Sequence, residues 1–336
     1  MSRVFIIAEA GVNHNGSVEL AVRLVDAAKA SGADAVKFQT FRADLLATPA
    51  APKAPYQERT TPGAESQFEM LQRLQLDAMD HERLIDHCQR VGIQFMSSPF
   101  DVQSADMLDR MNVPVYKVPS GEITNLPFLQ HLASKGRPLI LSTGMSTLGE
   151  VEEAVQVLQA AGARQLTLLH CVTEYPAPYP EVNLRAMLTL KSAFGLPVGY
   201  SDHTQGIEIT VAAVALGAEV IEKHFTLDRS LPGPDHSASL EPVELQRMVA
   251  AIRRVEAALG TGIKAPAPCE LPNLSIARKS VVASHSLPAG HQLASGDLEI
   301  KRPGNGLAPK LLPALIGRTL RVNVTKNEIM NWNHLA

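Results

Sequence analysis

The regular alternation of short apolar runs and helical segments along the first 230 residues is the feature that most constrains the fold. The apolar runs begin near Val4, Ala35, Ile93, Val115, Leu139, Leu166, Val198 and Val220. Segments with helical caps or spacing lie between several of these runs, for example 17–30, 147–161 and 183–194. Because the runs are apolar throughout, we expect each strand to be buried on both faces, as in a parallel sheet. This α/β pattern favours a closed (β/α)8 TIM barrel over an open doubly wound sheet, which usually has fewer strands.

The residues after the predicted barrel have a different pattern. Residues 264–273 contain Pro266, Pro268 and Pro272 and are expected to form an extended linker. Short β-like runs follow at 280–283, 298–301 and 319–324. We therefore predict a barrel domain at 1–262, a linker at 263–278 and a small, mostly β domain at 279–336. A domain this short without disulfides is marginally stable, so we expect it to rest on another surface.

Composition excludes several classes of function. The 336 residues are 45% hydrophobic with a net charge of −3, so the chain has no overall attraction to nucleic acid or to an anionic membrane. The three cysteines, Cys88, Cys171 and Cys269, match neither a zinc pattern nor a disulfide framework. The sequence starts with a strand-like run and contains no apolar run long enough to span a membrane. We predict a cytoplasmic protein without nucleic-acid or membrane partners.

One predicted connection, residues 41–64, is unusually long. It contains Pro49, Pro52, Pro55 and Pro62 and shows no periodic pattern. An irregular loop of this length usually covers a functional site, although a mobile insertion would have the same composition.

Polar residues follow nearly every predicted strand, where barrel enzymes build their sites. The candidates in chain order are Glu9, Asn13, His14, Lys37, Gln39, Ser97, Ser98, Lys117, Ser120, Glu122, Ser142, Thr143, Thr173, Tyr175, Ser201, Asp202, His203, Lys223 and His224. Each could be a helix cap or a solvated loop end. Lysines that end apolar strands are costly to bury without anionic partners, however, so their convergence predicts an active site.

Lys37 and Lys117 indicate an anion site. Together with Ser98, Ser120, Ser142 and the backbone amides of 142–144, they could hold the phosphate and carboxylate of a small phosphorylated acid. The alternative is that the lysines only pair with Glu9 or Glu122.

His203 and His224 end neighbouring parallel strands, so their imidazoles could meet at one point. Either could simply be a hydrogen-bonded residue at a strand end. As ligands they would leave an open coordination sphere, which favours a catalytic Mn²⁺ or Mg²⁺ over a structural Zn²⁺. The rigid turn 231–236 could place Asp235 over the barrel mouth, or Asp235 could be a cap.

The sequence motifs resemble those of the N-acetylneuraminate (sialic acid) synthase family along the whole chain. The matching stretches are 8–16 (AEAGVNHNG), 36–40 (VKFQT), 116–122 (YKVPSGE), 142–145 (STGM), 201–204 (SDHT), 222–226 (EKHFT), 233–236 (GPDH) and 301–306 (KRPGNG). The C-terminal part is similar to the family's antifreeze-like (SAF) domain.

The resemblance implies a transferase that condenses phosphoenolpyruvate with an N-acylated mannosamine-type sugar, giving a nine-carbon 2-keto acid and phosphate. It leaves two acceptors open, N-acetylmannosamine and the 2,4-diacetamido-2,4,6-trideoxymannose that leads to legionaminic acid. By matching positions, His203 and His224 hold the divalent metal, with Mn²⁺ expected and Mg²⁺ or Co²⁺ as alternatives. Lys37, Ser98, Lys117, Ser120, Ser142 and Ser201 hold phosphoenolpyruvate. Glu9, Gln39, Glu122, Tyr175 and Asp235 face the sugar and the metal-bound water. Thr173 is a further substrate-binding residue, and Ser98 and Thr173 stand where some relatives carry Thr and Asn.

The resemblance also implies a domain-swapped homodimer in which Arg302 enters the partner's site and contacts the N-acyl group. Glu9, Glu122, Asp235 and Arg302 are the expected catalytic residues. Two other classes stay open at this stage. A barrel aldolase, or a synthase of a shorter keto-sugar phosphate, would leave the C-terminal domain unexplained. A non-catalytic carbohydrate-binding or ice-binding protein would leave the strand-end lysines unexplained.

Overall fold

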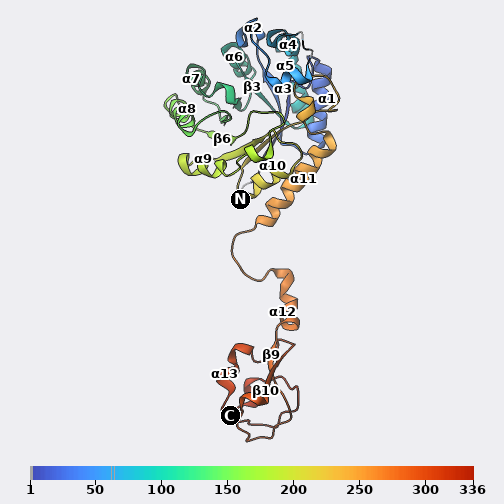
Figure 1. Cartoon of the computed structure of the whole chain (residues 1–336), viewed down its shortest axis with the longest axis vertical. Helices are drawn as coiled ribbons and strands as arrows, with labels where there is room; N and C mark the ends of the chain where they lie inside the picture. Colours follow the sequence, from blue (N-terminus) through green and yellow to red (C-terminus); the bar gives the residue numbers. More distant parts are fainter. Residues whose placement is uncertain (1–2, 62, 64) are drawn as a thin grey trace. The chain divides into compact units, whose positions relative to one another are not determined.

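Strands β1 to β8 close into a parallel barrel in sequence order, and helices surround it (Figure 1). The structure is a computed structural model that describes residues 3–61, 63 and 65–336. Pairing of Phe5 on β1 with Val220 on β8 closes the barrel. The predicted TIM barrel is therefore confirmed. The strands are β1 (Phe5–Gly11), β2 (Ala35–Thr40), β3 (Gln94–Pro99), β4 (Tyr116–Val118), β5 (Leu139–Ser142), β6 (Leu166–His170), β7 (Val198–Asp202) and β8 (Val220–His224).

The helices around the barrel begin and end at local sequence signals. The Ser17 hydroxyl accepts a hydrogen bond from the amide of Leu20 and so caps the first helix, while Thr147 and Glu150 form a capping box at another. The outer helices are α1 (Val18–Ala30), α5 (Ala78–Val91), α6 (Val102–Arg110), α7 (Leu126–Ser134), α8 (Leu148–Ala160), α9 (Ala186–Phe194), α10 (Glu208–Ala215) and α11 (Pro242–Leu259).

The strands bury two different faces, because successive side chains of a strand point in opposite directions. Outward residues such as Ile6, Val36 and Leu141 pack against the helices in the main apolar core. Inward residues form a separate plug inside the barrel, made of Phe5, Ile7, Ala35, Met96, Val115, Ile140, Leu169 and Val220. Gly199 lies against this plug, where a Cβ would come within 2.7 Å of Leu169 and 2.2 Å of the Val220 carbonyl oxygen. A side chain there would collide with the plug.

The long connection after β2 is more ordered than the sequence predicts. It forms the short helices α2 (Ala43–Leu46) and α3 (Pro55–Thr60), and α4 (Gln67–Leu74) follows before α5. Pro55 occupies the first turn of α3, where a proline is tolerated because no amide is needed. Side chains from α2 and α4 pack with Val12, Phe41 and Phe100 in a satellite apolar cluster. We call residues 41–77 the insert.

The chain divides into two compact units, the first ending at Gly260 and the second starting at Thr261. The expected linker is not extended throughout, because a 3-10 turn (Pro268–Glu270) leads into α12 (Leu271–Ala277). The second unit pairs β9 (Ser280–Ala283) with β10 (Leu298–Lys301) and contains α13 (Leu312–Leu315), whereas the predicted strand at 319–324 forms only isolated bridges. The second unit has its own hydrophobic core, which includes Val281, Leu298 and Met330.

Among the residues that the structure describes, no helix is both long and apolar enough to cross a membrane.

Candidate active site

The plug positions a layer of polar side chains directly above it. Each member lies two residues beyond a plug residue, within a strand or directly next to its end, so it points to the same inner side. Glu9 follows Ile7, Lys37 follows Ala35, and Ser98, Lys117, Ser142, Cys171 and Glu222 follow in the same way. These residues line a cavity of about 360 Å³ at the C-terminal mouth of the barrel. The predicted convergence of the strand ends is therefore present.

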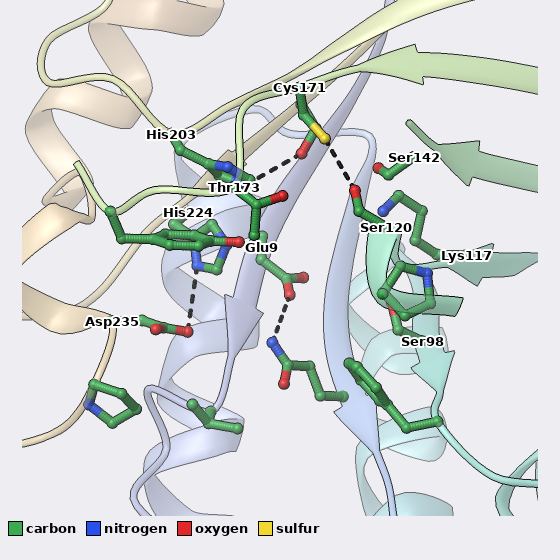
Figure 2. Close-up of a pocket in the computed structure, with 18 of the residues that line it drawn as sticks. Glu9, Ser98, Lys117, Ser120, Ser142, Cys171, Thr173, His203, His224 and Asp235 are labelled. Atoms are coloured by element: carbon green, nitrogen blue, oxygen red, sulfur yellow. Dashed lines mark hydrogen bonds and ion pairs between the residues drawn. The ribbon is translucent and has the colours of Figure 1, made fainter. Parts of the chain in front are cut away.

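Most of the predicted site residues meet at this cavity, whereas its lining does not include Asn13, His14, Ser97, Thr143, Asp202 and Lys223. The lining contains Glu9, Lys37, Gln39, Ser98, Lys117, Ser120, Glu122, Ser142, Thr173, Tyr175, Ser201, His203, His224 and Asp235. Figure 2 shows the histidines and Asp235 on one side, and Lys117 with Ser98, Ser120 and Ser142 on the other. Arg302 belongs to the second unit, where its side chain is exposed and its Nε donates to the Ala277 carbonyl oxygen at 3.0 Å.

A buried ion network occupies the inner end of the cavity. Lys37 Nζ lies 2.7 Å from Glu9 Oε2 and 3.7 Å from Glu222 Oε2, and Lys117 Nζ lies 3.4 Å from Glu222 Oε1. Both lysines are only 3% exposed. The expected pairing of a lysine with Glu9 is therefore present, but Glu222, not Glu122, is the second partner. Two lysines and two carboxyl groups therefore lie together inside the protein.

Burial and charge act in opposite directions on these carboxyl groups. Burial raises the pKa of Glu9 to about 7, and the attraction of Lys37 only partly offsets it. Burial also disfavours the charged form of Glu222, but Lys117, Lys37 and a hydrogen bond from Ser201 outweigh it and hold its pKa below the usual value. Glu222 is therefore the carboxylate that carries the negative charge between the lysines.

The hydroxyl groups beside the lysines are only partly used. Lys37 Nζ donates to Ser98 Oγ at 3.0 Å, and the amide of Gly144 donates to Ser120 Oγ at 2.9 Å. Ser142 Oγ and Thr173 Oγ1 are buried and have no hydrogen-bond partner among the described atoms, which marks them as groups that a ligand could satisfy.

The predicted nest of backbone amides is not free to bind an anion. The amide of Thr143 donates to the Leu169 carbonyl oxygen at 2.9 Å, and the amide of Gly144 is held by Ser120. A Cβ at Gly144 would lie 2.4 Å from Thr173 Oγ1 and 2.9 Å from Cys171 Sγ. The glycine thus permits close packing of three loops, and an anion here would depend on the lysines and hydroxyls.

His203 and His224 face each other across the other side of the cavity. Their ring centroids are 5.4 Å apart, and the ring of Tyr175 lies 4.2 Å from that of His203. His203 Nδ1 donates to the Val172 carbonyl oxygen at 2.5 Å, which leaves Nε2 as the nitrogen with a free lone pair. Burial lowers the pKa of both histidines, so both are neutral at neutral pH.

Two neutral imidazoles with available nitrogens fit a divalent cation. His224 Nδ1 is buried without a hydrogen-bond partner in the described part of the chain, and Asp235 Oδ2 lies 3.7 Å from it. No group of three or more His, Cys, Asp or Glu side chains among the described residues forms a closed metal site. The histidines would therefore provide a partial donor set that water or substrate oxygens complete.

Two carboxyl groups flank the outer cavity. Burial raises the pKa of Asp235 to about 6. Glu122 lies on a 3-10 turn (Ser120–Glu122), where it accepts a hydrogen bond from Asn125 at 2.7 Å and burial raises its pKa.

Asp202 and Lys223 do not belong to the cavity, contrary to the sequence-based list. Lys223 Nζ lies 2.9 Å from Asp202 Oδ2 in a buried ion pair, and neither side chain lines the cavity. Each is adjacent in sequence to cavity residues, so strand alternation turns it to the opposite face. Ser97 is excluded for the same reason and contacts Thr40 instead.

Several lining residues were not predicted individually. Glu222 and Cys171 could have been found by counting in steps of two from His224 and Leu169. Tyr56, from α3 of the insert, packs against Tyr175 with ring centroids 4.8 Å apart and ring planes tilted by 37°. Leu46, Met70, Leu71 and Leu74 of the insert also line the cavity. Only the length of the insert indicated that it covers a site.

A TIM barrel with buried lysines, hydroxyls and paired histidines at its mouth is typical of a TIM-barrel enzyme that binds an anionic substrate. Comparison with known families places the chain more closely: it belongs to the NeuB family, whose model matches residues 24–264, and a SAF domain matches residues 278–336.

Known relatives are similar over nearly the whole chain. The N,N'-diacetyllegionaminic acid synthase of Campylobacter jejuni is 51% identical, covering 98% of this chain and 99% of that protein. The synthase of the same name from Legionella pneumophila is 50% identical, covering 98% and 94%. A solved N-acetylneuraminic acid synthetase from Leptospira borgpetersenii is 38% identical with a TM-score of 0.72, covering 81% of this chain and 90% of that one.

Proposed function

We propose that the protein condenses phosphoenolpyruvate with an N-acylated mannosamine-type sugar to form a nine-carbon 2-keto acid and phosphate. The observation that carries the proposal is the meeting of Lys37 and Lys117 with His203 and His224 around one cavity. Lysines suit a phosphorylated acid, and paired neutral imidazoles suit a cation beside it. The names of the 51% and 50% identical relatives, both diacetyllegionaminic acid synthases, support the same reaction class.

Phosphoenolpyruvate is assigned to the inner end of the cavity. Lys37 and Lys117 would hold its phosphate and carboxylate, with hydroxyls from Ser98, Ser120, Ser142 and Ser201. Because these groups project from strand ends above a packed plug, the position of the enol carbon would be set before the sugar arrives. The Ser142 hydroxyl, which has no partner among the described atoms, gains one in this arrangement.

The sugar is assigned to the outer part of the cavity, with its open-chain aldehyde towards the histidines. A divalent cation, expected to be Mn²⁺, with Mg²⁺ or Co²⁺ as alternatives, would be held by His203 and His224 and would polarise the aldehyde oxygen. Glu9, Gln39, Thr173, Tyr175 and Asp235 would orient the sugar and its hydroxyls.

The bond changes follow from this placement. The enol carbon of phosphoenolpyruvate attacks the aldehyde carbon, and positive character develops at the carbon that bears the phosphate. Water adds to that carbon, and the resulting tetrahedral phosphohemiketal loses phosphate by C–O cleavage. Glu122 would orient that water or take its proton, since its raised pKa makes it a better base than an exposed glutamate.

The acceptor and the assembly are finer parts of the proposal. Both N-acetylmannosamine and the 2,4-diacetamido-trideoxy sugar satisfy the chemistry. Arg302, which precedes a Pro-Gly-Asn-Gly turn, is proposed to reach the cavity of a second chain in a domain-swapped homodimer and to contact the N-acyl group.

The proposal is tested by incubating the protein with phosphoenolpyruvate, Mn²⁺ and each acceptor separately. Phosphate release should require both organic substrates and should match the 2-keto acid formed. An aldolase of the same fold would form its product without releasing phosphate, and a non-catalytic sugar-binding protein would consume no phosphoenolpyruvate.

A further inference from the structure

Three loops at the barrel mouth meet around Gly144. Ser120 follows β4, Cys171 follows β6, and Gly144 belongs to the loop after β5. A Cβ at Gly144 would lie 2.9 Å from both Ser120 Oγ and Cys171 Sγ, so the two side chains pack against the same stretch of backbone. Cys171 is only 4% exposed and lines the cavity, yet the proposed reaction assigns it no role.

The hydroxyl group of Ser120 is contacted from two sides (Figure 2). The amide of Gly144 donates to Ser120 Oγ at 2.9 Å, and Cys171 Sγ lies 3.1 Å from the same oxygen. A hydroxyl group has two lone pairs and one hydrogen, so it can accept two hydrogen bonds and donate one. If the Cys171 thiol donates to the second lone pair, the hydrogen of Ser120 is left for a ligand in the cavity.

The groups beside this hydroxyl are suited to an anion. Ser142 is 2% exposed and lines the cavity, and its Oγ has no hydrogen-bond partner among the described atoms. Lys117 lies near enough to Cys171 to influence the pKa of the thiol. Figure 2 shows Ser142 and Lys117 on the same side of the cavity as Ser120 and Cys171. An anion bound by Lys117 and Ser142 would therefore lie next to Ser120.

Such an anion decides which atom donates between Ser120 and Cys171. The distance of 3.1 Å alone allows either direction. The Ser120 hydrogen makes a stronger bond to a charged oxygen than to sulfur, which is a weak acceptor. Burial raises the pKa of the Cys171 thiol, and Ser120 and Lys117 only partly offset this, so the sulfur keeps its hydrogen at neutral pH. With the anion bound, the thiol is therefore the donor.

We propose that Cys171 is a positioning residue for phosphoenolpyruvate, whose thiol donates to Ser120 Oγ and so directs the Ser120 hydroxyl towards an oxygen of the bound anion. This inference rests on the proposed function and adds to it a residue that acts through Ser120. Because the Gly144 amide still holds Ser120 Oγ without the thiol, the 3-10 turn that carries Glu122 should stay in place. Loss of the thiol should therefore change kcat much less than the affinity for phosphoenolpyruvate.

The first test measures this affinity directly. Phosphoenolpyruvate is titrated calorimetrically into the full chain with Mn²⁺ and without sugar. Cys171→Ala removes the donor and should raise the Kd by about 3- to 10-fold, since one neutral hydrogen bond contributes little net free energy. Cys171→Ser restores a donor and should recover most of the loss. Cys88→Ala is the control, because Cys88 is a buried cysteine outside the cavity lining, and its Kd should stay normal.

The second test determines whether Cys171 acts through Ser120. Ser120→Ala should itself weaken phosphoenolpyruvate binding, and adding Cys171→Ala to it should cause no further loss, because no hydroxyl is left to orient. Fold losses that multiply in the double variant would overturn the inference, since they would show that Cys171 acts independently of Ser120.

Steady-state kinetics separate this inference from the proposed function. In Cys171→Ala the KM for phosphoenolpyruvate should rise, while kcat and the KM for the sugar stay nearly constant. Condensation with an unchanged KM for phosphoenolpyruvate in this variant would reject the role of Cys171 and leave the proposed function intact. Absence of phosphate release by the unmodified protein with either acceptor would instead reject the proposed function, and the inference with it.

Discussion

The carboxylate of Glu222 lies 3.4 Å from the ammonium group of Lys117, with both side chains buried at the inner end of the barrel mouth. Glu222 also lies 3.7 Å from Lys37, so it bridges the cations assigned to phosphoenolpyruvate. Burial disfavours the charged form of both lysines; Glu222 and Glu9 outweigh it at Lys37 and raise its pKa, whereas at Lys117 burial lowers the pKa although Glu222 opposes it. An incoming phosphate must therefore share both lysines with Glu222.

Removal of either lysine should weaken phosphoenolpyruvate binding far more than sugar binding. In Lys37→Ala and Lys117→Ala, a charge-assisted contact to an anion held away from water is lost. The KM for phosphoenolpyruvate should rise by about 10- to 100-fold, the equivalent of roughly 1.5–3 kcal/mol. Steady-state kinetics with each substrate varied in turn measure the split. Lys191→Ala, which removes an exposed lysine paired with Glu219, is the control, and equal losses for both substrates would contradict the assignment.

Metal removal should abolish turnover, and Mn²⁺ should restore it, because His203 and His224 are the proposed ligands. His203→Ala and His224→Ala should lose metal content and activity together, typically by more than tenfold in affinity. Metal analysis after dialysis gives a readout independent of turnover. His131→Ala, on the outer helix α7 where His131 pairs with Asp106, should retain both. Full activity in protein shown to be free of metal would rule out this role.

Two buried histidines outside the cavity lining should make the barrel sensitive to acid. His14 and His81 are both 0% exposed, and burial lowers the pKa of each, that of His14 to about 3. Unfolded histidines take up protons below about pH 6.5, whereas the folded protein resists doing so. The contribution of these neutral histidines to the free energy of unfolding is therefore fully present above pH 6.5 and is lost as the pH falls towards 3.

At pH 5 the contribution of His14 alone corresponds to about 2 kcal/mol of lost unfolding free energy. Denaturant unfolding at pH 7.5 and pH 5, followed by circular dichroism, measures the loss. His14→Gln removes the titrating ring. The unfolding midpoints of this variant at pH 7.5 and pH 5 should therefore differ less than those of the unmodified protein. An unchanged separation in a folded variant would show that His14 does not contribute.

The swapped dimer predicts complementation between two inactive chains. Mixing Arg302→Ala with His203→Ala and allowing subunit exchange should create dimers in which an intact barrel receives an intact Arg302. Random exchange would restore about one quarter of the sites. A mixture of Lys37→Ala with His203→Ala is the control, because both defects lie in the barrel and no site becomes complete. If exchange is proven and the first mixture stays inactive, Arg302 does not act in the partner's site.

The barrel and most of the lining could be predicted because strand ends carry strong local signals. Lys37 and Lys117 interrupt apolar runs at a point where a buried cation needs an explanation. Grouping all polar residues at strand ends was less accurate, since it joined Lys223 to His224 although alternate residues face opposite sides. Counting alternate residues along the strand would have assigned Lys223 to the outer face and Glu222 to the cavity.

The helices of the insert could not be predicted from local pattern. Helices α2 and α3 are only four and six residues long, too short to show helical periodicity, and they are stabilised by contacts distant in sequence. The Thr60 hydroxyl, for example, donates to the Pro234 carbonyl oxygen at 3.4 Å. The occupied amides of Thr143 and Gly144 likewise depend on partners from β6 and from the turn after β4.

The most direct test of the proposed condensation follows oxygen from labelled water. The reaction is run in H₂¹⁸O with phosphoenolpyruvate, Mn²⁺ and the preferred acceptor, and both products are analysed by mass spectrometry. Unlabelled product incubated alone in H₂¹⁸O corrects for exchange at the new keto carbon. C–O cleavage predicts ¹⁸O at carbon two of the nine-carbon acid and none in the released phosphate. Label in the phosphate, with none at carbon two beyond exchange, would show P–O cleavage and contradict the proposed reaction.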